Sequence, residues 1–211
     1  MYTPPTFRED DPAIIRQMLR DAPFATLVTA TAQGLMGTPL PLFFAEEEQQ
    51  SVLYGHVAKA NPQWTSPPNG EALAIFSGPN AYVTPSWYAS KAEHGKVVPT
   101  WNYLAVHVYG QVEFFEDAAR LLDVVRKLTD LHEAPRAAPW AVSDAPDDFI
   151  VAQLKGIVGV RLVISRLDAK RKLSQNRPQA DREGVVAGLV QEAGEDARIL
   201  SALIRDDIDK T

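Results

Sequence analysis

The chain has 211 residues, of which 45% are hydrophobic and 23% charged, and its 27 acidic and 21 basic residues give a formal net charge of −6. This balance is typical of a folded globular protein and excludes extensive intrinsic disorder. The acidic surplus argues against a protein that coats nucleic acid non-specifically. Because there is no cysteine, disulfides, zinc–thiolate sites, Fe–S clusters and cysteine nucleophiles are excluded.

The N-terminal sequence MYTPPTFREDD has no basic region followed by an apolar run, so no secretory signal is predicted. No segment reaches the roughly 18 uninterrupted apolar residues of a membrane span. We therefore expect a soluble cytoplasmic protein. Because there is no internal repeat and no clear linker, we predict one domain over residues 1–211, with a helical C-terminal extension from about residue 178.

The first predicted element is a helix, with Asp11 as its cap, Pro12 at its first position and Pro23 at its end. The sequence then changes to short runs rich in Val, Thr, Phe and Leu that are bounded by turn residues, which is the pattern of strands. These strands are predicted at residues 24–31, 37–45, 51–58, 71–77 and 81–84, the last two separated by a GPN turn.

Residues 101–116 give the longest strand signal, with Val106 and Val108 on one side and His107 and Tyr109 on the other. At about 3.3 Å per residue, such a strand is long enough to bend around a barrel. Helical spacing and turn residues then predict a helix after Asp117, a short helix at 146–155, a strand at 157–167, and two helices near 181–190 and 195–206.

About six strands in succession indicate a mainly antiparallel sheet, because a parallel doubly wound sheet would alternate strands and helices strictly. Closing the sheet into a small barrel would remove its exposed edges. The predicted fold class is therefore mainly β, a six-stranded antiparallel barrel with peripheral α-helices.

The sequence lacks the GxSxG, GxxxxGK[ST], GxGxxG and HExxH signatures of common enzymes. Its four histidines, His56, His94, His107 and His132, show no i, i+4 spacing, so no metal site is predicted.

Three segments carry unusual groups. HVAKANPQW, residues 56–64, follows a strand and brings His56, Lys59 and Asn61 within six positions, where they could converge on an anion. The runs at 81–88 and 99–103 are rich in Trp and Tyr, which suit the wall of a pocket for a flat ligand. KRKLSQNR, residues 170–177, concentrates positive charge.

Each segment also has a simpler interpretation. The first is equally typical of a polar loop, the second of an aromatic core cluster or a dimer interface, and the third of a solvated basic loop or a nucleic-acid contact. If the third segment is extended, Lys172, Ser174 and Asn176 alternate onto one side.

Taken together, the segments resemble the PaiB family, the FMN-binding negative transcriptional regulators. The resemblance rests on MYTPPTF, H-x-x-K-A-N-P-Q-W, GP-x-A-Y-V-T-P-S-W-Y, V-P-T-W-N-Y with V-H-V-Y-G, and G-I-V-G with K-L-S-Q-N-R. It extends in order from Met1 to about Gly188.

The resemblance implies an FMN-binding split β-barrel of the pyridoxamine-phosphate-oxidase-like kind, in which two subunits pair and FMN lies at their interface. It implies that Lys59 provides charge to the FMN phosphate, while His56 and Asn61 donate hydrogen bonds to the phosphate or ribityl chain. Thr38 and Leu40 are expected beside the isoalloxazine ring. The opposite wall and further contacts, from the same or the neighbouring subunit, are expected from Trp101, Asn102, Tyr103, Lys172, Ser174, Gln175 and Asn176.

Two functions follow from the resemblance. The first is an FMN-binding regulator of transcription, although no helix-turn-helix is evident and only residues 166–177 offer a basic surface for DNA. The second is a flavin-dependent oxidoreductase that acts on a small molecule with NAD(P)H. A less favoured alternative is haem binding or degradation, with His56, His94 or His107 as the axial ligand.

Overall fold

The computed structural model describes residues 1–48 and 50–210. The chain divides into two compact units. Unit 1 comprises Met1–Met18, Ser77–Val106 and Asp168–Thr211, and unit 2 comprises Leu19–Phe76 and His107–Leu167. Three strands continue from one unit into the other, so the single domain expected from the sequence stays a prediction.

The strands form one sheet in the order β3-β2-β6-β7-β8-β5-β4, with β1 paired to β8. Their bounds are β1 Arg8–Glu9, β2 Phe24–Thr31, β3 Gly34–Pro41, β4 Phe43–Glu47, β5 Gln50–Ala58, β6 Ala72–Val83, β7 Thr100–Phe115 and β8 Ile157–Lys172. The pairs β2–β3, β2–β6, β4–β5 and β5–β8 are antiparallel. The predicted class, a mainly antiparallel β fold with peripheral helices, is confirmed, with eight strands in place of six.

The helices are α1 Pro12–Asp21, α2 Ser90–His94, α3 Ala118–Glu133, α4 Asp147–Leu154, α5 Gln179–Gln191 and α6 Glu195–Asp209, with short 3-10 turns η1 Pro5–Phe7, η2 Pro62–Thr65, η3 Pro85–Trp87 and η4 Val142–Asp144. Asp117 caps α3, as predicted, by accepting a hydrogen bond from the Arg120 backbone N–H at 2.8 Å. Among the described helices, none is both long and apolar enough to cross a membrane.

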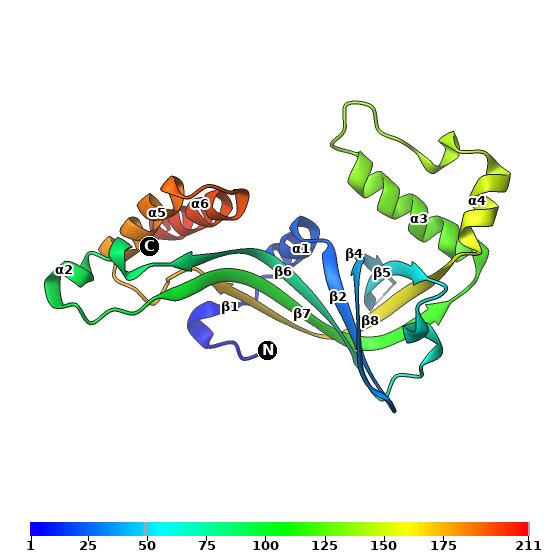
Figure 1. Cartoon of the computed structure of the whole chain (residues 1–211), viewed down its shortest axis with the longest axis horizontal. Coiled ribbons are helices and arrows are strands. Elements are labelled where there is room, and N and C mark those ends of the chain that lie inside the picture. Colours follow the sequence, from blue (N-terminus) through cyan, green and yellow to red (C-terminus); the bar gives the residue numbers. More distant parts are fainter. Residues whose placement is uncertain (49, 211) are drawn as a thin grey trace. The chain divides into compact units, whose positions relative to one another are not determined.

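The sheet of unit 2 has apolar side chains on both of its faces. On one face, Leu53 and Val57 of β5 and Val160 of β8 are buried in the core. The other face is covered by α3 and α4 (Figure 1). The apolar cluster on this side consists of Phe43, Phe115, Leu121, Val124, Leu128 and Leu154. Burial of each such large side chain contributes about 1.5–3 kcal/mol.

In unit 1, α5 and α6 pack against each other, and α5 packs closely on η3 (Figure 1). A Cβ added to Gly184 would lie 1.9 Å from the Trp87 carbonyl oxygen, and one added to Gly188 would lie 2.2 Å from the Trp87 ring. Asp181 of α5 accepts hydrogen bonds from the backbone N–H and the hydroxyl of Ser90. Two glycines and a buried carboxylate therefore fix α5 against the 85–90 segment.

Two strand predictions were wrong in their boundaries. The strand predicted at 37–45 is two strands, because the chain breaks at Leu42, whose N–H bonds to the Pro23 carbonyl at 2.9 Å. The strands predicted at 71–77 and 81–84 are one strand, β6, and the predicted GPN turn lies inside it. Gly78 serves close packing there, since an added Cβ would lie 3.0 Å from Leu104 Cβ.

The last strand is longer than predicted, and the segment after it is not extended. β8 continues to Lys172, five residues beyond the predicted end at Leu167. Ser174 then adopts φ = 64°, in the left-handed region, and the chain turns before α5. The strand-like alternation considered for residues 172–176 therefore does not form.

Candidate functional site

The residues implicated by the resemblance lie in both units. Thr38, Leu40, His56, Lys59 and Asn61 belong to unit 2, and the remainder belong to unit 1. In unit 2 they come from β3, from the end of β5 and from the turn between β5 and η2.

The turn after β5 is fixed by hydrogen bonds from side chains. Asn61 caps η2, because its Oδ1 accepts a hydrogen bond from the Gln63 N–H at 2.9 Å. Its Nδ2 donates to Thr38 Oγ1 at 2.8 Å. The fully buried Gln63 side chain donates to the Leu27 carbonyl, to Thr29 Oγ1 and to the Met36 carbonyl. The turn is thus held directly against β2 and β3.

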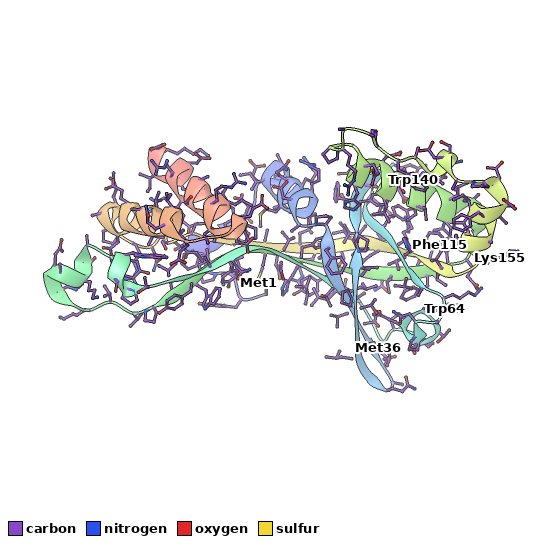
Figure 2. The ribbon with its side chains drawn as sticks, turned by 45° about the horizontal axis from the view of Figure 1, so that its top comes forward. Met1, Met36, Trp64, Phe115, Trp140 and Lys155 are labelled. Carbon is purple, nitrogen blue, oxygen red and sulfur yellow. The ribbon has the colours of Figure 1, made fainter. Side chains whose placement is uncertain are left out.

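Lys59 lies in this turn with its backbone well anchored. Its N–H donates to the Gly156 carbonyl at 2.8 Å, and its carbonyl accepts a hydrogen bond from Trp64 Nε1 at 2.8 Å. Figure 2 labels Trp64 in this turn and Lys155 at the end of α4. The Lys59 ammonium forms an ion pair with Glu116 at 2.5 Å, with both side chains about half exposed. The backbone is therefore fixed, while the charged group remains accessible to solvent.

His56 lies on the face of the sheet of unit 2 that α3 and α4 cover. It pairs with Gly159 across β5 and β8, and the Phe115 ring covers Gly159 on the α3 side. Since paired residues share a face, His56 lies on that side too. Its Nδ1 is buried without a hydrogen-bond partner among the described residues, and burial lowers the pKa of the imidazole. Leu40, in contrast, is buried in the core.

In unit 1, Asn102 and Ser174 form a buried polar pair. Asn102 Nδ2 donates to Ser174 Oγ at 2.9 Å, and both side chains are almost fully buried. Lys172 Nζ donates to the Trp101 carbonyl at 2.8 Å and to Thr100 Oγ1. These groups line one cavity of about 90 Å³, together with Tyr88, Asn176 and Arg177. Four of the predicted site residues, Asn102, Lys172, Ser174 and Asn176, thus meet at one place.

The remaining predicted residues of unit 1 have other surroundings. The Gln175 side chain stabilises the turn in which it lies, because it accepts a hydrogen bond from the Leu173 N–H and donates one to the Arg171 carbonyl. Trp101 is 52% exposed and packs edge-on against Tyr82, with ring centroids 6.3 Å apart. The Tyr103 ring faces the buried Lys170 ammonium at 5.2 Å.

The prediction omitted residues that turn out to line or support these places. Gln63 and Arg177 both lie inside the quoted motifs, so the motifs signalled them, but a glutamine and one more basic residue offered no reason to single them out. Thr100 lies inside the quoted V-P-T-W-N-Y motif as well, and it too was not singled out. Within the described part of the chain, no group of three or more His, Asp or Glu side chains is arranged to hold a metal ion.

Comparison with known proteins relates this arrangement to a family. Residues 1–166 match the family model described as "Putative FMN-binding domain". The chain is 32% identical over 211 residues to "Protease synthase and sporulation protein PAI 2" of Bacillus subtilis, covering 100% of this chain and 99% of that protein.

Two solved structures are similar in fold. The FAD and haem binding protein of Mycobacterium smegmatis has a TM-score of 0.57 at 14% identity, covering 86% of this chain and 80% of that chain. The flavocytochrome Anf3 of Azotobacter vinelandii has a TM-score of 0.55 at 16% identity, covering 78% and 69%. The full-length identity and the family match show that this chain belongs to the PaiB family of FMN-binding split-barrel proteins.

Proposed function

We propose that this chain is a cytoplasmic FMN-binding homodimer that acts as a negative regulator of transcription. The regulatory role is the one that the family resemblance implies, and a chain without cysteine suits a reducing compartment. In this proposal Lys59, Asn61 and Thr38 hold the FMN phosphate at the end of β5, and the flavin lies at a subunit interface.

The observation that carries the phosphate assignment is the hydrogen bond from Asn61 to Thr38. This bond joins two residues that the family resemblance assigns to the FMN site, from separate elements. Each of the two side chains keeps one N–H or O–H group that is free to donate another hydrogen bond. Asn61 Nδ2 retains its second N–H, and Thr38 retains its O–H, because it acts as acceptor in this bond. In the proposed complex the Lys59 ammonium leaves Glu116 and joins these donors at the oxygens of the phosphate ester.

Lys59 can exchange its present partner for a phosphate at little cost. An exposed ion pair such as Lys59–Glu116 contributes about 0–1 kcal/mol, whereas a hydrogen bond to a charged group contributes about 1.5–3 kcal/mol. The ammonium therefore turns from Glu116 to the phosphate, while the backbone bonds of the turn hold Lys59 in place. When bound, FMN supplies the redox-active isoalloxazine ring.

Within the basic segment at 170–177, Lys170 and Arg171 are poor candidates for contacts to DNA. Lys170 is buried, with its Nζ donating to the Tyr2 carbonyl, and Arg171 is paired with Glu9 and Asp207. Contacts to the DNA backbone require cations that are free to meet its phosphates. We infer that regulation acts through another surface or indirectly.

The test of the phosphate assignment is an FMN titration of the wild type and of Lys59→Ala. Loss of one charge-assisted hydrogen bond predicts FMN binding that is about 10- to 100-fold weaker in the variant. Lys155→Ala is the matched control, since this lysine borders the same depression beside Glu116 but follows α4. Equal FMN affinity in the wild type and Lys59→Ala would refute the assignment.

The proposed role in transcription is tested by measuring transcripts in three strains. One strain lacks the protein, one carries the wild type and one carries Lys59→Ala. The proposal predicts derepressed transcripts without the protein and with the variant. The competing outcome is unchanged transcripts, combined with anaerobic reduction of bound FMN by NAD(P)H faster than that of free FMN. That result would reject regulation in favour of an oxidoreductase.

A further inference from the structure

The cavity of unit 1 is lined by groups that suit an anion. Its polar lining comes from Tyr88, Thr100, Asn102, Lys172, Ser174, Asn176 and Arg177, and no carboxylate lines it. Its volume of about 90 Å³ corresponds to about three water molecules at roughly 30 Å³ each. It therefore has room for a group of a few heavy atoms.

The two cations at this cavity have no carboxylate partners among the described residues. Lys172 donates only to the Thr100 hydroxyl and the Trp101 carbonyl, and the Arg177 guanidinium stacks on the Tyr88 ring at 4.6 Å. The neighbouring Arg171, in contrast, pairs with both Glu9 and Asp207. In the same short segment, one cation is therefore neutralised by ion pairs, and the two at the cavity form no ion pair with the described residues.

The electrostatic surroundings of these cations also favour an incoming anion. Burial, and then the charge of Lys170, lower the pKa of Lys172. Asp181 is the acidic group that acts on Arg177 and Tyr88, but its oxygens already accept two hydrogen bonds from Ser90. An anion in the cavity would relieve the repulsion between the two lysines and would compete with only one carboxylate.

A buried hydroxyl at the cavity is left without a hydrogen bond. Tyr88 is 3% exposed, and its Oη forms no hydrogen bond of ordinary geometry with the described residues. Burial raises the pKa of Tyr88, and the nearby Arg177 only partly opposes this effect, so the hydroxyl stays protonated and able to donate. A buried donor without a partner is costly unless a ligand or a water satisfies it.

The backbone at the cavity adopts an uncommon conformation at Ser174, which pairs with Asn102. Ser174 has φ = 64°, which is uncommon for a residue with a side chain and costs energy. This conformation places Ser174 Oγ within 2.9 Å of Asn102 Nδ2. The strained turn thus places the Ser174–Asn102 pair in the lining of the same cavity as Lys172 and Arg177.

We propose that this cavity binds a phosphate group, with Lys172 and Arg177 providing the charge and the Tyr88 hydroxyl donating a hydrogen bond. A dianion matches two cations that form no ion pair with the described residues. The phosphate belongs either to a small phosphate ester bound beside FMN or to FMN itself, and the second source would exclude the assignment of the FMN phosphate to Lys59. This inference goes beyond the proposed function, because it does not depend on the assignment of Lys59.

The test is a titration with inorganic phosphate at fixed ionic strength, followed by ³¹P NMR, on the wild type and three variants. Arg177→Gln is expected to raise the Kd for phosphate by about tenfold or more. Tyr88→Phe is expected to raise the Kd several-fold without lowering the melting temperature, since its hydroxyl has no hydrogen bond of ordinary geometry to lose. Arg198→Gln, which removes an exposed cation of the same unit, is expected to bind phosphate like the wild type.

Titrations with FMN and riboflavin identify the source of the phosphate. If it belongs to FMN, Arg177→Gln weakens FMN binding but not riboflavin binding, and inorganic phosphate competes with FMN. If it belongs to a separate ligand, FMN affinity is the same in Arg177→Gln and the wild type. Absence of phosphate binding to the wild type, or an equal Kd in the wild type, Arg177→Gln and Tyr88→Phe, would overturn the proposal. Lys59→Ala reports separately on the proposed function.

Discussion

Gly184 shows how a single hydrogen atom in place of a side chain permits close packing. Replacing a helical glycine by alanine normally stabilises a helix by about 1 kcal/mol. Here the new Cβ would lie 1.9 Å from the Trp87 carbonyl oxygen, so α5 or η3 has to move. We predict that Gly184→Ala lowers the free energy of unfolding by about 1–3 kcal/mol, as overpacking does, when measured by urea denaturation.

Gly37→Ala is the control for this prediction. The nearest atoms to a Cβ at Gly37 belong to Thr26 and Val28 at 3.7 and 4.0 Å, which are ordinary contacts. This variant should be at least as stable as the wild type, with a gain of up to about 1 kcal/mol. A Gly184→Ala protein that is as stable as the wild type would show that the contact with Trp87 relaxes freely.

A charge network in unit 2 makes stability depend on pH. Arg161 donates hydrogen bonds to Glu47 and to the Tyr54 hydroxyl, and Tyr54 donates to Glu47. The Arg161 bond, followed by the Tyr54 bond, lowers the pKa of Glu47 below its usual 4.5. A lowered pKa in the folded state adds stability above the unfolded pKa, and this contribution is lost as pH falls through the folded one.

We therefore predict that the free energy of unfolding falls as the pH is lowered below about 4.5, and that Glu47→Gln makes this fall shallower. The measurement is a series of urea denaturation curves between pH 7 and pH 3. Glu48→Gln serves as the control, because Glu48 forms no ion pair within the described chain. Parallel curves for the wild type and Glu47→Gln would contradict the linkage.

Among the elements, those with a regular period were the most predictable from the sequence. The alternation along residues 101–116 and the capped helix after Asp117 both correspond to real elements, because one buried face repeats regularly in each. The GPN sequence was misleading, because glycine is typical of turns and also permits close packing. Only the tertiary position of Leu104 shows that Gly78 serves packing.

The candidate site was predictable only as a set of motifs. The sequence indicated that Asn61 and Lys59 belong together, since they are two positions apart, but the partner of Asn61 is Thr38, 23 residues earlier. Nor could it show that the strand ends at Lys172, or that Ser174 turns into the left-handed region. Long-range pairing and backbone conformation decide both points.

Gln63 links η2 to two strands, and its loss should loosen the turn that carries Lys59. Its Nε2 is the donor to three acceptors on β2 and β3. We predict that Gln63→Ala lowers the free energy of unfolding by about 2–4 kcal/mol, since it leaves a cavity and unsatisfied carbonyl groups.

This prediction is checked by urea denaturation alongside Gln153→Ala. Gln153 is an exposed residue of α4, so its variant should match the wild type. If Gln63→Ala keeps wild-type stability, the buried amide contributes nothing net to folding.

At the scale of the whole molecule, an exposed aromatic pair suggests where two copies meet. Tyr82 on β6 is 49% exposed and Trp101 on β7 is 52% exposed. Large aromatic side chains that are exposed in one subunit are typical of the surfaces that subunit interfaces bury. We predict that Tyr82→Glu dissociates the proposed homodimer, because the interface would have to bury an unpaired carboxylate.

Light scattering after size-exclusion chromatography measures the mass directly. Phe149→Glu, at an equally exposed aromatic residue on α4, should leave the dimer intact. A monomeric wild type, or a dimeric Tyr82→Glu at every concentration, would exclude this surface as the interface.

The continuity of β8 through both units restricts which length changes the chain tolerates. In unit 2, Val160 pairs with Gly55, and in unit 1, Ala169 pairs with Glu9, so one unbroken strand has two fixed registers. Inserting one residue between these pairs would turn every later side chain of the strand, including Lys172, to the opposite face. Inserting two residues would restore the orientation. A two-residue insertion therefore keeps the alternation of this strand, whereas a single inserted residue has to be absorbed by a β-bulge.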